Sequence, residues 1–171
     1  MGGVDKGLIA YRGRPMIEWA LAAIAPQVGE CVISANRNLD TYAGYGHRVL
    51  PDTLPDFPGP LAGVLAALDA VSVDWLVVVP CDTPHLPADL VSRLREAARQ
   101  AQVPLAIAAD DSRTHHTCFI VRTDQRDTLA AFLARGERAV RHWQAGLPST
   151  TMRFDAACFA NFNQPQDLQA G

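Results

Sequence analysis

The sequence predicts an α/β fold in three layers, with a mainly parallel sheet and helices on both of its faces. Short apolar strand patterns alternate with helical patterns of about 10 to 14 residues, which is typical of units that cross over one face of a sheet. The run at 75–79 (WLVVV) is continuously apolar, as expected for a strand covered on both faces. The 171 residues contain no repeat and no linker-like stretch, so we predict a single domain over residues 1–171.

In the first half of the chain, the elements follow from proline positions and apolar spacing. Pro15 precedes an apolar stripe at helical spacing, and proline is favoured at the first position of a helix. Four prolines and a glycine within 51–60 predict an ordered, extended loop, and the segment behind it is rich in alanine and leucine, which favours helix. The predicted elements are a helix at 15–25, strands at 31–33 and 49–50, the loop at 51–60 and a helix at 61–71.

In the second half, the strand at 75–79 ends at the turn P-C-D-T-P. Behind this turn, leucine and valine alternate with arginine and glutamate in a pattern typical of an amphipathic surface helix. The predicted elements that follow are a helix at 89–102, strands at 104–109 and 117–121, helices at 128–133 and 139–143, and a strand at 150–154.

Composition excludes several classes of protein. The 15 basic and 18 acidic side chains give a net charge of −3 without any basic block, which argues against a nucleic-acid binder. The apolar runs are far shorter than the roughly 20 residues that a membrane-spanning helix needs. The four cysteines are far apart and form no C-x-x-C pair, so we expect buried, reduced thiols in a cytoplasmic protein rather than a zinc site or a disulfide framework.

Polar side chains follow the predicted strands where ligands bind in α/β sheets, outside the carboxyl ends. Asn36 follows the first strand, Asp52 the second and Asp82 the third. We therefore expect Asp52 and Asp82 to open into one cleft, with Val32, Val49 and Val78 on neighbouring strands. His115 and His116 are also candidates, but adjacent strand residues face opposite ways, so at most one of them reaches a pocket.

Three features of this edge suit a nucleotide, and each has a plainer interpretation. Mg²⁺ takes one or two carboxylates plus substrate phosphates, so Asp82 is a candidate metal ligand or else a helix cap. Lys6 lies in the glycine-flanked G-G-V-D-K-G, where it could neutralise a phosphate or be merely solvated. The turn at 58–63 (PGPLAG) could present backbone N–H groups to an anion or a base edge, or be only a rigid turn.

Six blocks together resemble the molybdenum cofactor guanylyltransferases, in order and along essentially the whole chain. The blocks are GGVDKG at 2–7, ANR at 35–37, PDTLPDFPGPLAG at 51–63, PCDTP at 80–84, GER at 136–138 and FANFNQPQDL at 159–168. The resemblance implies a Rossmann-like fold of the nucleotide-diphospho-sugar transferase type. It further implies transfer of GMP from GTP to Mo-molybdopterin with Mg²⁺, giving the guanine dinucleotide cofactor and pyrophosphate, and molybdoenzyme-specific chaperones as further partners.

Residue by residue, the resemblance implies that Lys6 contacts the nucleotide phosphates and that Asp52 and Asp82 bind the nucleotide. It also makes Asp82 the Mg²⁺ ligand and places Asn161 and Asn163 near the acceptor. Positioning and charge neutralisation by such groups suit an attack on the α-phosphorus. Ser34 stands where the family usually has asparagine, and Asn36 keeps the A-N-R pattern, so either residue could read the guanine.

The resemblance also shows a departure at the front, because the family opens with a buried strand and a glycine-rich phosphate loop. Met1 matches an internal methionine of that opening, so we expect a central strand and most of the loop to be missing. Two alternatives stay open: another nucleotidyltransferase of this fold, acting on molybdopterin with CTP or on a sugar phosphate, or a non-catalytic nucleotide-binding protein.

Overall fold

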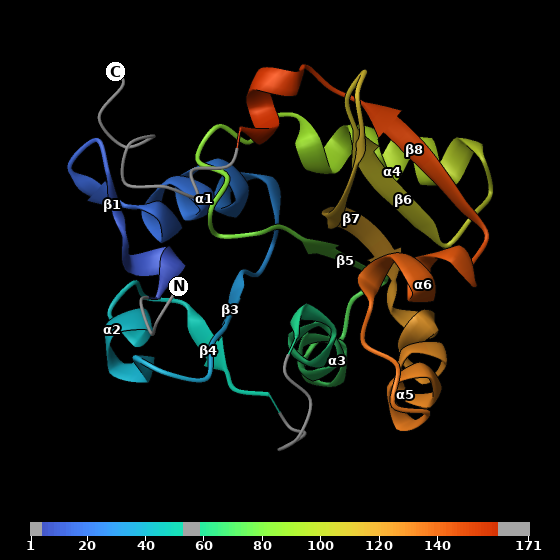
Figure 1. The fold of residues 1–171 in the computed structure, drawn as a ribbon, viewed down its shortest axis with the longest axis horizontal. Helices are drawn as coiled ribbons and strands as arrows, with labels where there is room; N and C mark the ends of the chain where they lie inside the picture. The colour runs from blue at the N-terminus through green and yellow to red at the C-terminus, as the bar shows by residue number, and fades with distance from the viewer. Residues whose placement is uncertain (1–4, 53–58, 161–171) are drawn as a thin grey trace.

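The computed structural model describes residues 5–52 and 59–160 (Figure 1). Its strands are β1 (Ala10–Tyr11), β2 (Arg14–Pro15), β3 (Val32–Ser34), β4 (Arg48–Leu50), β5 (Trp75–Val78), β6 (Leu105–Ala109), β7 (Thr114–Arg122) and β8 (Ser149–Arg153). Its α-helices are α1 (Met16–Ile24), α2 (Leu39–Ala43), α3 (Pro60–Ala70), α4 (Leu90–Gln100), α5 (Arg126–Ala134) and α6 (Val140–Ala145). Short 3-10 turns are η1 (Lys6–Leu8), η2 (Ala25–Gln27), η3 (Thr123–Gln125) and η4 (Ala156–Phe159).

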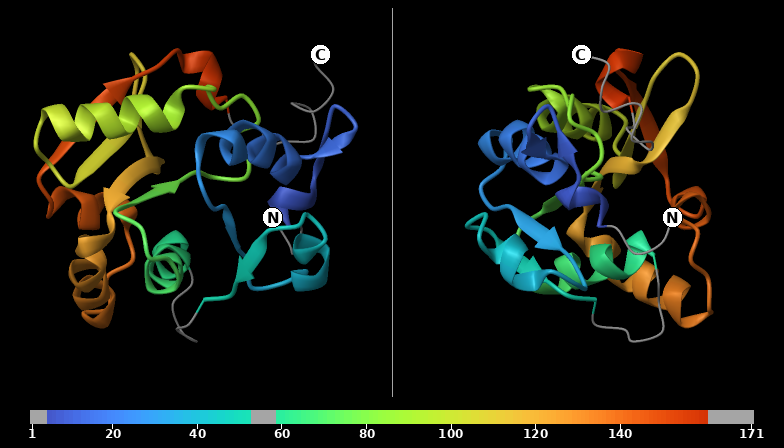
Figure 2. Two further views of the ribbon diagram at one scale, coloured as in Figure 1. Left: turned by 180° about the vertical axis from the view of Figure 1, so that it is seen from behind. Right: turned by 60° about the vertical axis from the view of Figure 1, so that its left-hand side comes forward.

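Helices cover both faces of the larger sheet, which confirms the predicted α/β layers (Figures 1 and 2). Alternate residues of a strand point to opposite faces. Ala106 and Ile120 accordingly pack into one apolar cluster with α4, whereas Ile107 and Phe119 pack into another with α3, α5 and α6. All four of these strand residues are buried, so the core lies on both sides of β6 and β7.

The expectation of a mainly parallel sheet is wrong in detail, because the larger sheet is mixed. Its order is β5-β7-β6-β8, and β7 runs antiparallel to both of its neighbours. The cause is the short turn between β6 and β7, since strands joined by a tight turn must run in opposite directions. Only β6 with β8, and β3 with β4 in a separate pair, are parallel.

The predicted helices and strands are all present, with boundaries that shift by a few residues. The hairpin of β1 and β2 and the helix α2 were not predicted, since each is too short to carry a periodic apolar pattern. Most of the loop predicted at 51–60 lies outside the described residues. No helix in the described part of the chain is both long enough and apolar enough to cross a bilayer.

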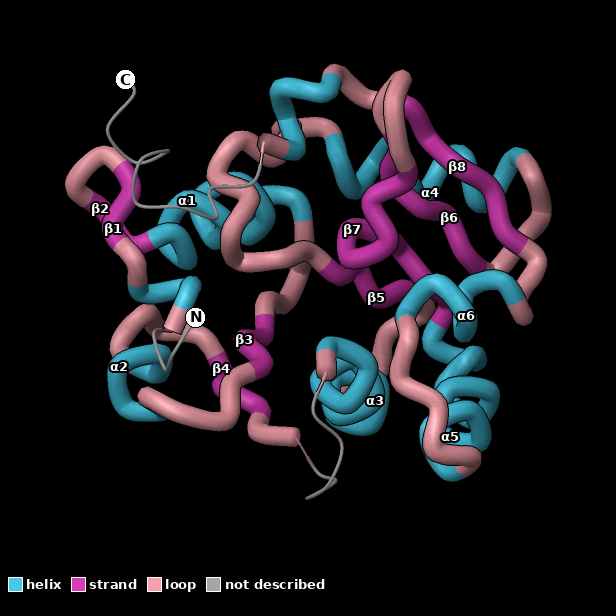
Figure 3. Tube along the Cα trace, viewed as in Figure 1, coloured by secondary structure: helices cyan, strands magenta, loops and turns pink. Residues whose placement is uncertain are grey.

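The strands fall into separate groups at the point where a continuous sheet was expected (Figure 3). Among the described strands, β3 is hydrogen-bonded only to β4, and β5 only to β7. Val32 and Val49 therefore lie on neighbouring strands as predicted, but Val78 does not join them, and this part of the prediction is wrong. The physical reason is that no described strand lies between β3 and β5 to connect their ladders.

An apolar cavity of about 720 Å³ lies between these two groups. Leu21 of α1, Ile33 of β3, Val64 of α3 and Val77 of β5 are among its lining residues. All four residues of β5 are only partly buried, although their sequence is that of a strand covered on both faces. The cavity thus accounts for the incomplete burial of β5.

Candidate functional site

Lys6 and Asp82 lie close together in the fold although they are 76 positions apart in the sequence. Lys6 begins the turn η1, and Asp82 lies in the turn that follows β5. The Lys6 Nζ and Asp82 Oδ2 atoms are 3.5 Å apart, with 47% of the lysine side chain and 14% of the aspartate side chain exposed. A pair this accessible contributes little to stability, so the ammonium can exchange this partner for another anion at small cost.

The carboxylate of Asp5 anchors the turn that carries Lys6. It caps η1 by accepting a hydrogen bond from the Gly7 N–H at 3.2 Å. It also accepts from the Asn38 side-chain amide at 3.0 Å and from the Tyr42 hydroxyl at 2.6 Å. Because Asn38 precedes α2 and Tyr42 lies within it, Asp5 fastens η1 to α2.

Gly7 is required by the close approach of its neighbours. A Cβ placed at Gly7 would lie 2.5 Å from the Tyr42 hydroxyl and 3.5 Å from the Cys81 Sγ. The backbone of Gly7 therefore fits between α2 and the residue that precedes Asp82. Any side chain at position 7 would push η1 away from α2 or from Cys81.

Burial and negative charge keep the neighbouring acids of this cluster protonated. Burial, together with the negative charges of Asp82 and Asp5, raises the pKa of the Cys81 thiol to about 11. Burial also raises the pKa of Tyr42, and the hydrogen bond to Asp5 adds to this. Cys81 is therefore a neutral thiol near pH 7, not a nucleophile.

Asn36 and Asp52 form a second cluster, at the ends of β3 and β4. The Asn36 amide donates to Asp52 Oδ2 at 2.7 Å, and the Asp52 N–H donates to Asn36 Oδ1 at 2.8 Å. These strands are parallel and in register, which places their following residues side by side. The strand-end rule placed both residues at this edge, but it did not predict that they bind each other.

Ser34 and Gly63 connect the second cluster to the cavity. Both line it, as does Cys81 beside Asp82. A Cβ at Gly63 would overlap the Ser34 hydroxyl and would lie 3.5 Å from Asp52 Oδ1. Neither Asp52 nor Asp82 is among the residues that line the cavity, so their opening into one cleft stays a prediction.

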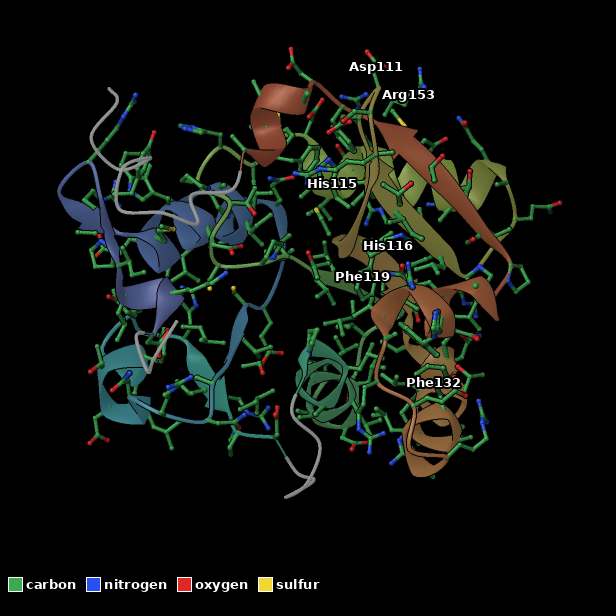
Figure 4. The ribbon with its side chains drawn as sticks, viewed as in Figure 1. Asp111, His115, His116, Phe119, Phe132 and Arg153 are labelled. Atoms are coloured by element: carbon green, nitrogen blue, oxygen red, sulfur yellow. The ribbon has the colours of Figure 1, made fainter. Side chains whose placement is uncertain are left out.

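His115 and His116 point away from each other and belong to structural contacts (Figure 4). The His115 Nε2 lies 2.7 Å from Asp110 Oδ2, and its ring stacks on Phe159 at 4.1 Å. The His116 Nδ1 lies 2.7 Å from the Gln144 side-chain oxygen. Neither histidine lines the cavity, so the structure does not place them among the groups around it.

The magnesium ion predicted at Asp82 stays a prediction. The described residues contain no group of three or more metal-ligating side chains, so a cation here would need oxygen atoms from a bound phosphate. Thr83, the next residue, is buried, and its hydroxyl has no hydrogen-bond partner among the described residues. Asn161 and Asn163, predicted near the acceptor, lie outside the described residues.

Comparison with known proteins decides the family. Residues 1–149 match the model of the MobA-like NTP transferase domain. The molybdenum cofactor guanylyltransferase of Bordetella petrii is 44% identical over 174 residues, covering 99% of this chain and 89% of that protein. The chain belongs to the molybdenum cofactor guanylyltransferase family. Its class is therefore that of a nucleotidyltransferase, as the sequence predicted.

Solved structures place this family member in the predicted fold. Molybdopterin-guanine dinucleotide biosynthesis protein A from Archaeoglobus fulgidus superposes with a TM-score of 0.80 at 22% identity, covering 98% of this chain and 88% of that one. The 2-C-methyl-D-erythritol 4-phosphate cytidylyltransferase from Thermus thermophilus gives a TM-score of 0.74 at 23% identity, covering 95% of this chain and 90% of that one. Both likenesses confirm the nucleotide-diphospho-sugar transferase fold.

Sequence reasoning named Lys6 and Asp82 as candidates, and the structure brings them together, but it missed the residues that hold Lys6 in place. Asp5 is adjacent to Lys6, yet its partner Tyr42 is 37 positions away in a helix that was not predicted. The only available signal was the aspartate directly before the glycine-flanked lysine, a residue type that commonly caps a turn. In the G-E-R block, the Arg138 guanidinium donates to the Leu133 carbonyl at the end of α5.

Proposed function

We propose that this protein transfers GMP from GTP to Mo-molybdopterin, releasing pyrophosphate. The observation that carries the proposal is the pairing of Lys6 with Asp82, which brings a candidate phosphate contact and a candidate Mg²⁺ ligand within 3.5 Å of each other. The names of the relatives, molybdenum cofactor guanylyltransferase, support it. In the reaction, a phosphate oxygen of the acceptor forms a bond to the α-phosphorus of GTP. The bond to the β-phosphate breaks, and pyrophosphate leaves with the electron pair.

Lys6 and Asp82 would act on the phosphates. The Lys6 ammonium, which now faces a carboxylate, would turn to the triphosphate and neutralise its charge. Asp82 would hold Mg²⁺, which supplies positive charge to the transferring phosphate and to the pyrophosphate. Holding both reactants in one orientation would provide much of the rate, since phosphoryl chemistry needs little covalent help from a protein.

Asp52 would read the base. Guanine presents N–H donors on its Watson–Crick edge, including the N2 amino group, and a carboxylate accepts from such donors. Asn36 already uses its amide oxygen and nitrogen on Asp52, so it fixes the carboxylate instead of reading the base itself. Ser34, at the position where the family usually has asparagine, lines the cavity and would contribute its hydroxyl.

The remaining parts of the proposal rest on the family resemblance. Asn161 and Asn163 would contact the molybdopterin acceptor, and molybdoenzyme-specific chaperones would receive the product. A cytoplasmic location is proposed because the four cysteines are free thiols, a state that a reducing compartment maintains.

The test measures pyrophosphate release from GTP with Mg²⁺ and Mo-molybdopterin. We assay the 171-residue chain and a version extended before Met1 by an apolar strand and a glycine-rich loop. Asp82→Ala is expected to abolish transfer while leaving the thermal transition intact. Asp124→Ala, which removes an exposed carboxylate paired with Arg122, is the matched control and should leave the rate unchanged.

Two results would contradict the proposal. Near-normal turnover by Asp82→Ala would reduce this aspartate to a cap of the following turn. Equal use of CTP and GTP in competition would move the protein to cytidylyl transfer, because a site built for one base can discriminate by factors on the order of 10⁴. Nucleotide binding without any Mg²⁺-dependent turnover in either version would favour a non-catalytic role.

A further inference from the structure

Lys6 lies on a turn of only three residues, and a long flexible side chain on such a turn has no fixed direction of its own. Its ammonium nevertheless stands 3.5 Å from Asp82, which lies 76 positions away in the sequence. The lysine side chain is about half exposed, so the position of its ammonium depends on how firmly the backbone of η1 is held.

The fixing contacts converge on Asp5, directly before Lys6. Three donors reach its two carboxylate oxygens: the Gly7 N–H and the Tyr42 hydroxyl on Oδ1, and the Asn38 amide on Oδ2. Hydrogen bonds to an ionised group are about twice as strong as those between neutral groups. Because both oxygens of the Asp5 carboxylate accept such bonds, they join η1 firmly to α2. Tyr42 is only 5% exposed, so its hydroxyl is a fixed point in the core.

The other side of η1 is held in place by close packing at Gly7. Gly7 fits between the Tyr42 hydroxyl and the Cys81 sulfur with no room for a side chain. Since Cys81 precedes Asp82, the turn of Lys6 and the turn of Asp82 are packed against each other through this glycine. A shift of the Asp5 carboxylate would therefore move Lys6 relative to Asp82.

We propose that Asp5 is a positioning residue for Lys6, whose carboxylate sets where the lysine ammonium stands by fastening η1 to Tyr42 and Asn38. This inference rests on the proposed role of Lys6 at the nucleotide phosphates. Asp5 itself accepts hydrogen bonds from Gly7, Asn38 and Tyr42, and we infer that it acts on the nucleotide through Lys6.

The first test measures the order of the turn and needs no activity. Amide ¹⁵N relaxation should give order parameters near 0.85 for Lys6 and Gly7 in the wild-type chain, and below about 0.6 in Asp5→Ala. Asp5→Asn keeps one acceptor oxygen for Tyr42 and Gly7 and should restore most of the order. Asp40→Ala, which removes an exposed carboxylate of α2, is the matched control and should change nothing.

The second test is a double-mutant cycle on the affinity for Mg²⁺–GTP, measured by calorimetry. Lys6→Ala and Asp5→Ala should each weaken binding by about tenfold, the order expected for losing a hydrogen bond to a charged group. In the double variant Asp5→Ala/Lys6→Ala, affinity should match that of Lys6→Ala alone within about twofold, because Asp5 acts only through the lysine. The thermal midpoint of each variant is recorded alongside.

The outcomes separate the two proposals. Unchanged order of Lys6 in Asp5→Ala overturns the positioning role, and so does a double variant whose two losses simply multiply. If the wild-type chain binds Mg²⁺–GTP no better than Mg²⁺–CTP, the proposed function fails, and the relaxation data then decide the role of Asp5 by themselves.

Discussion

Asn36 and Asp52 hold each other through two hydrogen bonds of opposite direction, side chain to side chain and backbone to side chain. The amide of Asn36 is thereby used at both its oxygen and its nitrogen. Asp52 keeps Oδ1, the oxygen nearest to Gly63, for another donor. The arrangement presents a carboxylate of fixed orientation at the edge of the cavity.

Asp52→Asn should reduce the preference for GTP. The variant keeps the size of the side chain but loses its charge and one acceptor, so a guanine N–H donor is left facing an N–H group. We expect kcat/KM for GTP to fall by about 10- to 100-fold, the range that one hydrogen bond to a charged group provides. The value for CTP should change little, and steady-state assays with both nucleotides measure the difference.

Asp69→Asn serves as the control for this substitution. Asp69 is a partly exposed carboxylate at the end of α3 that pairs with Arg126, and it does not line the cavity. An equal loss for GTP and CTP in Asp52→Asn would mean that this carboxylate does not read the base.

Gly63→Ala should damage both stability and nucleotide binding. The added Cβ would overlap the Ser34 hydroxyl, and overpacking of this kind costs roughly 1 to 3 kcal/mol. Because the displaced atoms lie beside Asp52, the affinity for GTP should fall as well. Thermal unfolding and calorimetric titration measure the two effects.

A second substitution separates this clash from a general effect of alanine. The Ser34 Cβ would itself lie 2.9 Å from the new Cβ, so Ser34→Ala cannot relieve the contact but Ser34→Gly can. Ser34→Gly/Gly63→Ala should therefore regain stability that Gly63→Ala loses. Gly29→Ala, where no atom lies within 4 Å, is the control. Failure of the glycine variant to rescue would place the cause elsewhere.

The stability of the fold should depend on pH through Asp110, in the turn between β6 and β7. Hydrogen bonds from the Ser112 hydroxyl and N–H, with others from His115 and Arg113, hold the pKa of Asp110 below its usual range. Since the unfolded pKa is about 3.9, this stabilisation is present above pH 4 and is lost as the pH falls toward the lower folded value. The thermal midpoint of the wild-type chain should therefore fall between pH 5 and pH 3.

Comparison of two variants isolates this contribution. Asp110→Asn should show a shallower fall than the wild-type chain over the same range. Asp111→Asn removes the neighbouring carboxylate, which is 92% exposed and pairs with Arg153, and should keep the wild-type slope (Figure 4). Identical slopes for all three proteins would contradict the assignment.

Much of the fold could be predicted because its signals are local. The helices α1, α3, α4 and α5 and the strand β5 each contain enough apolar residues to show a period. The helix α2 has five residues and depends on Tyr42 packing against Asp5, which no local pattern reveals. The antiparallel direction of β7 follows from the turn held by Asp110, whose hydrogen bonds to the N–H groups of Ser112 and Arg113 do not show in the apolar pattern of the strands.

The candidate site was predicted as far as the strand-end rule reaches. That rule found Asp52 and Asp82, and the glycine-flanked motif found Lys6. It could not assign Asn36 to Asp52, since the partner of a side chain depends on register between strands. The same limit applies to His115, which was a candidate contact for substrate and instead binds Asp110.

The last prediction concerns the cavity between β3 and β5. Each strand has one edge without a hydrogen-bonded partner among the described strands, and apolar side chains of both line the space between them. Unpaired strand edges beside an apolar cavity favour the addition of another strand.

A strand of branched apolar residues, fused before Met1 through a glycine-rich loop, should therefore insert between β3 and β5. Each buried apolar side chain adds roughly 1.5 to 3 kcal/mol, and about 1 kcal/mol moves the Tm of a chain this long by roughly 2 to 4 °C, so the Tm should rise by about 10 °C or more. Hydrogen exchange gives the direct readout, because the amides of Ile33 and Val77 should become protected only in the fused chain. A fusion of equal length that alternates lysine and glutamate is the control. Unchanged exchange in β3 and β5 of the fused chain would show that this space does not receive a strand.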